Sequence, residues 1–391
     1  MDLPYWIHED CFIFKPDFNG SIIDYIDIIK LHSKLIFSNY NDLESSIKKI
    51  NGEKYYSEKY NGSEFNQPLD NSLNSLKNLT LINFGDDFNQ PLSNSLIQLT
   101  NLKHLTFGDD FNQPLANSLI QLTNLTHLSF GPCFNQPLSD SLIQLKNLTY
   151  ITFGFHFDQP LGNSLDKLIN LTHMTFGGCF DKPLGCSLNK LINLKELNFS
   201  YYFDQPLGNS LDKLINLTHI TFSYHFDQQL ANSLDKLINL THITFGWNFN
   251  QPLANSLDKL INLTNITFNY QFNQPLGNSL QKLINLTDLR LGMMFNQELY
   301  LPPNVKILRL DCNNQNLVDN LQNSIEQLKL DNNFNLPLDN LPSSIKKISL
   351  YNPYYDNLLN NLPVSLKQLE LPKSYKLEIK NIPPNCKIIY L

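Results

Sequence analysis

The chain has 391 residues, 42% of them hydrophobic and 17% charged, which is enough for two or three ordinary domains or for one long repeat array. Its formal net charge of −7 provides no global positive field for nucleic acid or for an acidic membrane surface, and its two arginines, Arg290 and Arg309, leave little for bidentate phosphate recognition. The six cysteines show no C-x-x-C spacing, which argues against a disulfide framework or a zinc site and indicates a reducing compartment.

The start of the chain, MDLPYWIHEDC, has no basic stretch followed by an apolar run, so the sequence predicts no signal peptide. No stretch approaches the roughly 18 uncharged apolar residues that a membrane span requires. The recurring tripeptide NLT, as at Asn124, is formally a glycosylation acceptor, but its place inside a repeat indicates a structural origin. We therefore expect a cytoplasmic protein that binds neither membranes nor nucleic acid.

Residues 1–64 differ from the rest of the chain, and we expect them to form an N-terminal cap that shields the first strand edge. Ser21 followed by Asp24 resembles a capping box. The apolar-rich run that follows predicts a helix over 22–36.

Part of this cap also looks like degenerate repeats. Residues 34–47 place Leu35 and Phe37 on a strand, with Tyr40 where later repeats have a phenylalanine. Residues 55–65 look like a second degenerate repeat.

Ten repeats of 23 residues occupy residues 65–294. A fixed period in the twenties is typical of a solenoid with one supersecondary unit per coil. Each repeat begins with a phenylalanine, and the same residue recurs where the next segment starts. These anchor phenylalanines are Phe65, Phe88, Phe111, Phe134, Phe157, Phe180, Phe203, Phe226, Phe249, Phe272 and Phe295.

One coil illustrates the predicted strand. Leu102, Leu105 and Phe107 follow the pattern L-x-x-L-x-F. Because Leu105 and Phe107 are two residues apart, they share the inner face of a strand, and His104 and Thr106 point outward.

The same coil then returns to the core at the anchor Phe111. Pro114 suits the first turn of a short helix, and Leu115, Leu119 and Leu122 form one stripe of a helical segment. Such a coil cannot close a core alone, but stacked coils bury these side chains against one another, at roughly 1.5–3 kcal/mol per large side chain.

Residues 295–391 carry about five shorter repeats of 20 residues. Their predicted strands are KILRL (306–310), EQLKL (326–330), KKISL (346–350), KQLEL (367–371) and KIIYL (387–391). Pro342 and Pro363 predict a turn or an extended segment between strands rather than a helix. The strand KIIYL offers an unpaired edge, so self-association through it is an open alternative.

The pattern L-x-x-L-x-F/L resembles the strand of a leucine-rich repeat. The unit F-N-Q-P-L…S-L…L and the later form FNLPLDNLPSSIKKISL (334–350) resemble the FNIP repeat, a relative found in social amoebae and in giant DNA viruses of amoebae. The resemblance covers roughly 65–391. It implies an α/β fold: a right-handed leucine-rich-repeat-like solenoid with a parallel β-sheet on its concave face and short helices or turns on its convex face.

The chain departs from the leucine-rich-repeat pattern at the asparagine that usually follows the strand. Asp110, Cys133 or His156 occupies that position here. We expect Asn112, or Asp158 in a later repeat, to take over the inward bonding to the backbone.

A column of outward-facing histidines is the first candidate surface. It contains His104, His127, His173, His219 and His242, interrupted by Tyr150 and Glu196. We expect neighbouring histidines to lie about 4.8 Å apart and to depress each other's protonation. Parallel columns do not converge as metal ligands must, so we expect no bound metal and no cofactor.

The residues just after each strand are the second candidate surface, because they vary inside an otherwise copied repeat. Aromatic side chains are frequent among them, as in interface hot spots. We call the following set the aromatic ridge: Phe155, Tyr201, Tyr202, Tyr224, Trp247 and Tyr270. Drift in unconstrained loops is the alternative explanation.

The sequence carries no glycine-rich phosphate loop, no G-x-S-x-G and no H-E-x-x-H motif, so we expect no enzyme. The favoured function is a scaffold that binds a protein partner of the cytosol, or of the host cytoplasm if the chain is viral. Because some FNIP proteins carry an F-box, the resemblance leaves a second possibility: residues 1–45 with Leu3-Pro4 would recruit a cullin-type ubiquitin ligase. A metal-dependent activity on the histidine column is a third.

Overall fold

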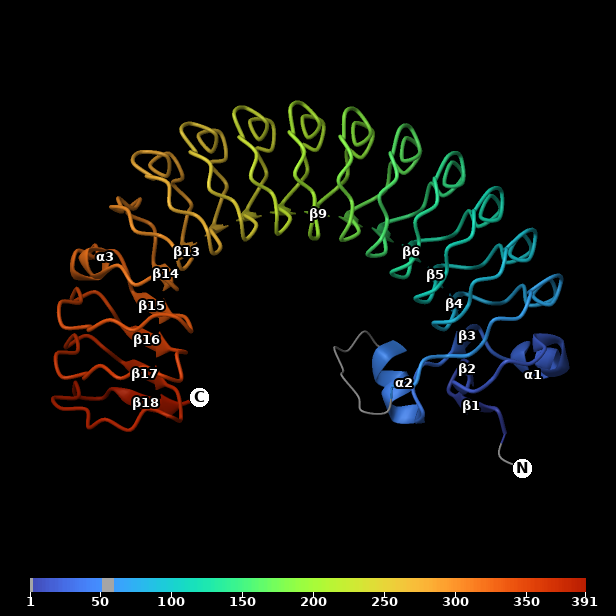
Figure 1. Ribbon diagram of the computed structural model, residues 1–391, viewed down its shortest axis with the longest axis horizontal. Coiled ribbons are helices and arrows are strands. Elements are labelled where there is room, and N and C mark those ends of the chain that lie inside the picture. Colours follow the sequence, from blue (N-terminus) through green and yellow to red (C-terminus); the bar gives the residue numbers. More distant parts are fainter. Residues whose placement is uncertain (1–2, 51–59) are drawn as a thin grey trace. The chain divides into compact units, whose positions relative to one another are not determined.

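The computed structural model describes residues 3–50 and 60–391, in two compact units: unit 1 (Met1–Tyr201) and unit 2 (Tyr202–Leu391). Each unit is a stack of coils with one short strand per coil (Figure 1). The strands of unit 1 are β1 (Tyr5–His8), β2 (Cys11–Phe14), β3 (Lys34–Phe37), β4 (Leu81–Asn83), β5 (His104–Thr106), β6 (His127–Ser129), β7 (Tyr150–Thr152), β8 (His173–Thr175) and β9 (Glu196–Asn198). Those of unit 2 are β10 (His219–Thr221), β11 (His242–Thr244), β12 (Asn265–Thr267), β13 (Asp288–Leu291), β14 (Ile307–Leu310), β15 (Gln327–Leu330), β16 (Lys347–Leu350), β17 (Gln368–Leu371) and β18 (Lys387–Tyr390).

The strands of each unit pair in parallel and in register, as in a leucine-rich-repeat-like solenoid. His104 pairs with His127 in unit 1, and His219 pairs with His242 in unit 2. The exception is β1, which pairs antiparallel with β2. The predicted fold class is therefore confirmed, and equivalent side chains of successive coils lie in columns.

Two phenylalanines per coil form the core of the long repeats. In one coil of unit 1 the ring centres of Phe107 and Phe111 are 4.0 Å apart. Phe107 stacks on Phe130 of the next coil at 5.6 Å, and Phe111 stacks on Phe134 at 6.1 Å. All four rings are buried, with at most 3% of their surface exposed. The predicted row of aromatic and leucine side chains thus forms one continuous core within each unit.

The strands line the concave side of each unit (Figure 1). Ring centres in the histidine column of unit 1 are 4.1–4.4 Å apart. Ring centres of successive anchor phenylalanines in unit 1 are 5.8–6.2 Å apart. The rings are closer together on the strand face because the stack of coils curves towards that face.

The segment expected to be a short helix forms a chain of turns instead. The amide of Ser118 donates to the carbonyl of Leu115 at 2.9 Å, and Leu122 donates to Leu119 at 3.0 Å. Each bond closes three residues back, which is tighter than an α-helix. Of the two forms predicted for the convex side, short helices or turns, these coils have turns.

A left-handed residue explains why a helix cannot form there. Ala116 directly follows Leu115 and has φ of 42°, and Gly162 has φ of 51° at the same repeat position. A residue in this region cannot continue a right-handed helix, and glycine adopts it without steric cost. Small residues recur at this position because of this backbone requirement.

The shorter repeats of unit 2 keep one strand per coil, at the predicted places. Pro342 and Pro363 each begin a turn, as expected, because their carbonyls accept from the amides of Ile345 at 3.2 Å and Leu366 at 2.9 Å. One helix that the sequence analysis did not predict, α3 (Gln315–Asp319), follows β14. Its N-cap is Asn314, whose side chain accepts a hydrogen bond from the amide of Leu317.

The N-terminal coils follow the repeat more closely than predicted. Phe18 stacks on Phe14 at 3.8 Å, and Phe65 stacks on Phe37 at 4.0 Å, as Phe88 does on Phe84 at 4.2 Å. The prediction that Tyr40 replaces the anchor was therefore wrong: Tyr40 forms an isolated bridge with Tyr60.

The described residues between β3 and Phe65, 38–50 and 60–64, thus belong to an insertion in a coil. It contains α2 (Leu43–Ile50). The degenerate repeat expected over 55–65 lies mostly outside the described residues.

The helix predicted over 22–36 is shorter than expected. It consists of η1 (Ile22–Tyr25) and α1 (Ile26–Ile29), because residues from Lys34 join the sheet as β3. The hydroxyl oxygen of Ser21 accepts a bond from the amide of Ile23, so Ser21 is the N-cap. None of the helices in the described parts of the chain is long and apolar enough to cross a membrane.

The structure contradicts the basis of the F-box possibility. Two strands, β1 and β2, lie between Leu3-Pro4 and the first helical segment, and β2 pairs with β3 in the sheet. Phe12 and Phe14 of β2 are fully buried. The described part of residues 1–45 therefore belongs to the solenoid core rather than to a separate recruitment module.

Candidate functional site

The histidine column of unit 1 is a continuous stack of rings on the strand face. His104 stacks on His127 at 4.2 Å, His127 on Tyr150 at 4.4 Å, and Tyr150 on His173 at 4.1 Å. Glu196 follows, with its Oε1 3.5 Å from Nε2 of His173. The strands alternate outward and buried side chains, so the column faces outward as predicted.

Unit 2 has a shorter column. His219 stacks on His242 at 4.2 Å, and Asn265 and Asp288 continue the column in register. Asp288 accepts two bonds from Arg309, from Nε at 3.3 Å and from Nη2 at 3.0 Å. The column thus changes from imidazole rings to a charged pair at β13.

Burial and neighbouring charge disfavour protonation of two histidines in unit 1, His104 and His127. Burial lowers the pKa of His104, helped by Lys103 and Lys34. Burial also lowers the pKa of His127, and repulsion from His104 and His173 adds to the effect. The effect predicted from the spacing is therefore present at His127, whose pKa His104 and His173 help to lower.

His242 behaves in the same way in unit 2. Burial lowers its pKa, repulsion from His219 adds to the effect, and Asp288 opposes it.

A metal site needs three or four ligands that converge on one point. The stacked rings lie parallel to one another instead, at interplanar angles of 9–20° in unit 1. Among the described residues, no group of three or more His, Cys, Asp or Glu side chains could hold a metal ion.

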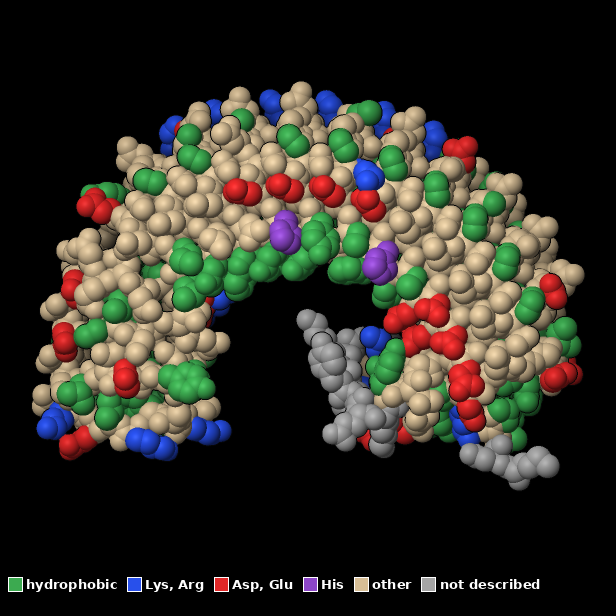
Figure 2. All heavy atoms as spheres, in the orientation of Figure 1, with side chains coloured by type: hydrophobic (Ala, Val, Ile, Leu, Met, Phe, Trp, Pro, Cys, Tyr) green, Lys and Arg blue, Asp and Glu red, His purple; other side chains and the backbone are tan. Residues whose placement is uncertain are grey.

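The aromatic ridge of unit 2 is a second stack beside the strands. Tyr224 stacks on Trp247 at 5.4 Å, and Trp247 stacks on Tyr270 at 4.4 Å. Trp247 is 39% exposed. Tyr202 stacks on His225 in the neighbouring column at 5.1 Å. Figure 2 shows hydrophobic side chains along the inner rim of this unit.

The ridge residues of unit 1 are less regular. Phe155 is 46% exposed, and its ring lies edge-on to that of His156 at 5.2 Å and against Gly178 of the next coil. Tyr201 is exposed as well. The corresponding residues of the earlier coils are Asp86 and Asp109, so the aromatic character of this position begins at Phe155.

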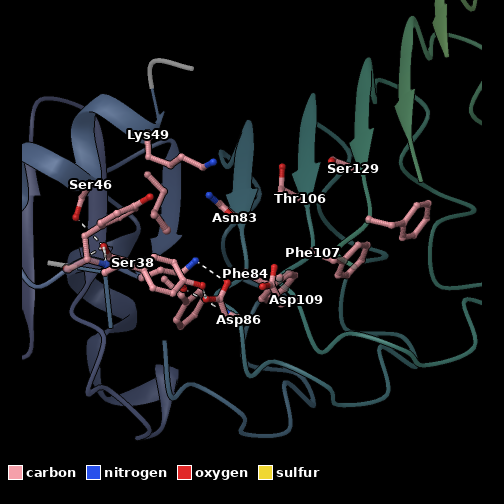
Figure 3. A pocket seen from close by; sticks show the side chains of 18 residues that line it. Ser38, Ser46, Lys49, Asn83, Phe84, Asp86, Thr106, Phe107, Asp109 and Ser129 are labelled. Atoms are coloured by element: carbon pink, nitrogen blue, oxygen red, sulfur yellow. Dashed lines mark hydrogen bonds between the residues drawn. The ribbon is translucent and has the colours of Figure 1, made fainter. Parts of the chain in front are cut away.

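Sequence reasoning missed a cavity in unit 1 of about 330 Å³ (Figure 3). It lies between the insertion after β3 and the ends of β4, β5 and β6. The hydroxyl of Tyr60 and Nδ2 of Asn39 both donate to the carboxylate of Asp86. Burial raises the pKa of Asp86 against these two bonds. Lys49 of α2 and Asp109 also line the cavity, which is therefore a polar recess at the start of the strand face.

A column of exposed isoleucines on the other side of the coils was not predicted from the sequence. In unit 2 these are Ile215, Ile238, Ile261 and Ile284, each 48–59% exposed. The recurrence of LIN every 23 residues was the available signal. Because this isoleucine lies outside the i, i+4, i+7 stripe of leucines, it could have been predicted to face solvent.

The asparagines of the repeat have structural roles. Oδ1 of Asn112 accepts from the amide of Asn135 in the next coil at 2.9 Å, so it takes over the backbone bonding as predicted. In the NLT tripeptide, Nδ2 of Asn124 donates to the carbonyl of Thr100 at 2.8 Å. Both ladders tie each coil to its neighbour.

No family model matches the chain, and no curated protein matches it. Among solved structures it is similar to the giant-virus protein CroV588, described as a circular leucine-rich-repeat protein, with 26% sequence identity and a TM-score of 0.72. The match covers 99% of this chain and 60% of CroV588, so the chain spans less than two thirds of that protein's length.

Two further similarities concern the fold alone. Internalin InlF of Listeria monocytogenes is 15% identical with a TM-score of 0.56, over 89% of this chain and 87% of the internalin. Protein LIC12759 of Leptospira interrogans is 18% identical with a TM-score of 0.54, over 83% of this chain and 92% of the other. The chain is therefore a leucine-rich-repeat-type parallel β-solenoid with a structural counterpart in a giant virus.

Proposed function

We propose that this protein is a non-catalytic scaffold that binds a protein partner through the concave strand face and the aromatic ridge. The observation that carries the proposal is the stack of Tyr224, Trp247 and Tyr270 beside the strands of unit 2, in which Trp247 is exposed and both tyrosines are partly exposed. Large aromatic rings held in fixed positions at a surface bind with little loss of conformational entropy. Burying such rings against a partner supplies both binding affinity and shape complementarity.

The comparisons support the class of function by analogy. One similar structure is that of Toll in complex with Spätzle, in which a leucine-rich-repeat chain binds a protein; it is 19% identical with a TM-score of 0.55. Fold analogy licenses a class of function and not a particular partner.

We further infer that the repeats are FNIP repeats and that the protein works in the cytoplasm, or in the host cytoplasm if it is viral. The repeated F-N-Q-P-L motif and the likeness to CroV588 support the first inference. All six cysteines are free, which suits a reducing compartment and supports the second.

A triple substitution tests the ridge. Tyr224→Ala, Trp247→Ala and Tyr270→Ala together remove the stack, and Ile238→Ala, Ile261→Ala and Ile284→Ala provide a control that removes exposed apolar surface from the other side of the same unit. Each variant is used as bait in an extract of the native cell, and captured proteins are quantified by mass spectrometry.

We expect the ridge variant to capture its main partner at least about tenfold less than the unsubstituted protein, because losing even one hot-spot aromatic costs more than about 2 kcal/mol, roughly thirtyfold in affinity. The isoleucine variant should capture the same partner unchanged. Equal capture by the ridge variant and the unsubstituted protein would reject the proposal, provided that circular dichroism shows both to be folded.

A further inference from the structure

The strand face of unit 1 begins with a row of polar side chains that no other side chain satisfies. Asn83 of β4, Thr106 of β5 and Ser129 of β6 occupy equivalent outward positions in register. All three are half-buried, and no described residue bonds to their side chains. Their amide and hydroxyl groups can each donate and accept hydrogen bonds. The row continues as Thr152 and Thr175, so by itself it is an ordinary solvated surface.

The insertion after β3 turns the start of this row into the floor of a recess. Lys49 of α2 extends towards the strands, and Asp109 lies on the wall (Figure 3). Tyr60 and Asn39 hold the carboxylate of Asp86 in the same wall, because both donate to it. The cavity of about 330 Å³ lies at the lower end of the range for small-molecule sites, roughly 300–1,000 Å³. Its size therefore suits a ligand of about one six-membered ring.

The lining argues against ions and against apolar molecules. The ammonium group of Lys49 repels a cation, and the carboxylates of Asp86 and Asp109 repel an anion. An apolar molecule would displace water from the floor and leave its amide and hydroxyl groups without hydrogen bonds. A neutral molecule with several hydroxyl groups matches the whole lining, because each hydroxyl can donate to a carboxylate and accept from an ammonium group.

The two carboxylates gain more from hydrogen-bond donors than from another ion. Burial raises the pKa of Asp109, repulsion from Asp110 adds to the effect, and Lys49 already opposes it. Burial also raises the pKa of Asp86, although Tyr60 donates to it. Hydroxyl groups stabilise such carboxylates by donating to them, and no second ion has to leave water.

We propose that the recess between α2 and strands β4, β5 and β6 binds a sugar ring, an uncharged six-membered ring that carries several hydroxyl groups. Lys49 and Asp109 bond to its hydroxyl groups from two sides, and Thr106 bonds to it from the floor. The inference goes beyond the proposed function, because it assigns a small-molecule site to unit 1 that the ridge of unit 2 does not require.

The first test establishes the class of ligand. Saturation-transfer NMR follows binding of the methyl α-D-pyranosides of glucose, mannose and galactose to the full-length protein. The control probes are cyclohexanol, which has a similar ring with one hydroxyl, glycine betaine, tetramethylammonium and inorganic phosphate. We expect at least one glycoside to bind with a Kd of about 1 mM, at least about tenfold more tightly than any control. No saturable binding of the three glycosides, or tighter binding of a control, would overturn the proposal.

The second test locates the site with matched pairs of variants. Thr106→Val removes a hydroxyl from the floor, whereas Thr244→Val removes the equivalent hydroxyl of β11, which does not line the recess. Asp109→Asn removes a charge from the wall, whereas Asp110→Asn makes the same change outside the lining.

We expect Thr106→Val to weaken binding of the glycoside about fivefold and Asp109→Asn to weaken it at least about tenfold, the scale of a neutral and of a charged hydrogen bond. The two control variants should bind it within about twofold of the unsubstituted protein. Equal effects within either pair would place the sugar elsewhere and overturn the proposal. Circular dichroism shows that each variant is folded, and Asp109→Asn changes an exposed side chain that the fold does not require.

The ring has two possible sources, a free sugar or the terminal sugar of a glycan on a protein. A glycan array probed with the labelled protein separates them. Array signals that Asp109→Asn removes assign the site to an attached glycan. Binding of the methyl glycoside without array signals assigns it to a free sugar.

The two proposals fail separately. If the glycosides do not bind while capture by the ridge of unit 2 persists, only the sugar site is lost. If ridge-dependent capture fails while a glycoside binds, the scaffold function is rejected and the recess keeps its ligand.

Discussion

The same 23-residue period produces ladders of rings inside the solenoid and outside it. In unit 1, Phe107 stacks on Phe130 in the core at 5.6 Å, while His104 stacks on His127 on the strand face at 4.2 Å. The phenylalanines are at most 3% exposed, and the histidines are half-buried. The repeat period alone therefore does not show whether a column of side chains stabilises the fold or is available for binding, whereas burial does. The inner ladders hold the coils together, and the outer ladders are available to a partner.

The sharpest test of this difference uses two aromatic residues of one coil in unit 2. Phe249 is fully buried and stacks on Phe245 at 4.3 Å, whereas Trp247 is 39% exposed. We expect Phe249→Ala to lower the free energy of unfolding by about 3–5 kcal/mol, because it leaves a cavity in the core. Trp247→Ala should change it by less than about 1 kcal/mol.

Urea denaturation followed by circular dichroism measures both variants. Because repeat arrays can unfold in parts, the comparison requires that the slope with urea stay constant. Similar losses for the two variants would mean that the ridge is part of the core, and the distinction between inner and outer ladders would fail for this unit.

A close backbone approach gives the next largest effect. A Cβ added to Gly246 would lie 1.6 Å from the carbonyl oxygen of Ser223 in the preceding coil. We expect Gly246→Ala to cost about 2–4 kcal/mol, since the two coils must move apart. The control is Gly208→Ala, where no atom lies within 4 Å of the added Cβ. Equal stability of the Gly246 variant and the unsubstituted protein in urea would show that neighbouring coils are not held this tightly.

Most of the fold could be predicted from the sequence because the same weak sequence pattern recurs in every repeat. One L-x-x-L-x-F pattern is ambiguous, but its recurrence every 23 residues predicted the strands, the anchor Phe111 and the bonding of Asn112. The turns were mistaken for a helix because the leucine spacing carries no information about the left-handed Ala116. The insertion before Phe65 was not recognised, because Tyr40 follows its strand at about the distance expected of an anchor phenylalanine.

The candidate site could be predicted only in part. Alternation along a three-residue strand placed His104 and Thr106 outward, and the structure agrees. The cavity beside Asp86 could not be predicted, because it depends on how the insertion returns to bring Tyr60 against that carboxylate. The contact between Oγ1 of Thr126 and Nδ1 of His127 could not be predicted either, because it depends on a distance and not on residue type.

A smaller effect comes from the left-handed position of the repeat. Gly208 has φ of 51°, and Ala254 has φ of 47° at the equivalent position. We expect Gly208→Ala to cost about 1 kcal/mol, purely from backbone strain, and Ala254→Gly to stabilise the protein by up to about 1 kcal/mol. Thermal unfolding of the two reciprocal variants checks the signs. Two changes of the same sign would mean that side-chain contacts, rather than φ, select the residue here.

The smallest expected effect is the dependence of stability on pH from the outer ladder. Burial and like charge lower the pKa of His104, His127 and His242 in the folded protein, so the unfolded chain binds more protons below the ordinary histidine pKa of about 6.5. The free energy of unfolding should therefore fall as the pH drops below about 6.5, and it should not depend on these groups above that value.

Urea midpoints between about pH 5.5 and about pH 7.5 measure this slope, in a range above the titration of ordinary carboxylates. His127→Gln should flatten it, because it removes a titrating ring whose pKa is lowered by burial and by repulsion from His104 and His173. The effect is limited because these rings are only half-buried and their charges are screened by solvent. An equally steep dependence of stability on pH without His127 would mean that burial and like charge do not lower the pKa of the histidines in the outer ladder. The outer ladder would then differ from the phenylalanines of the inner ladder only in its exposure to solvent.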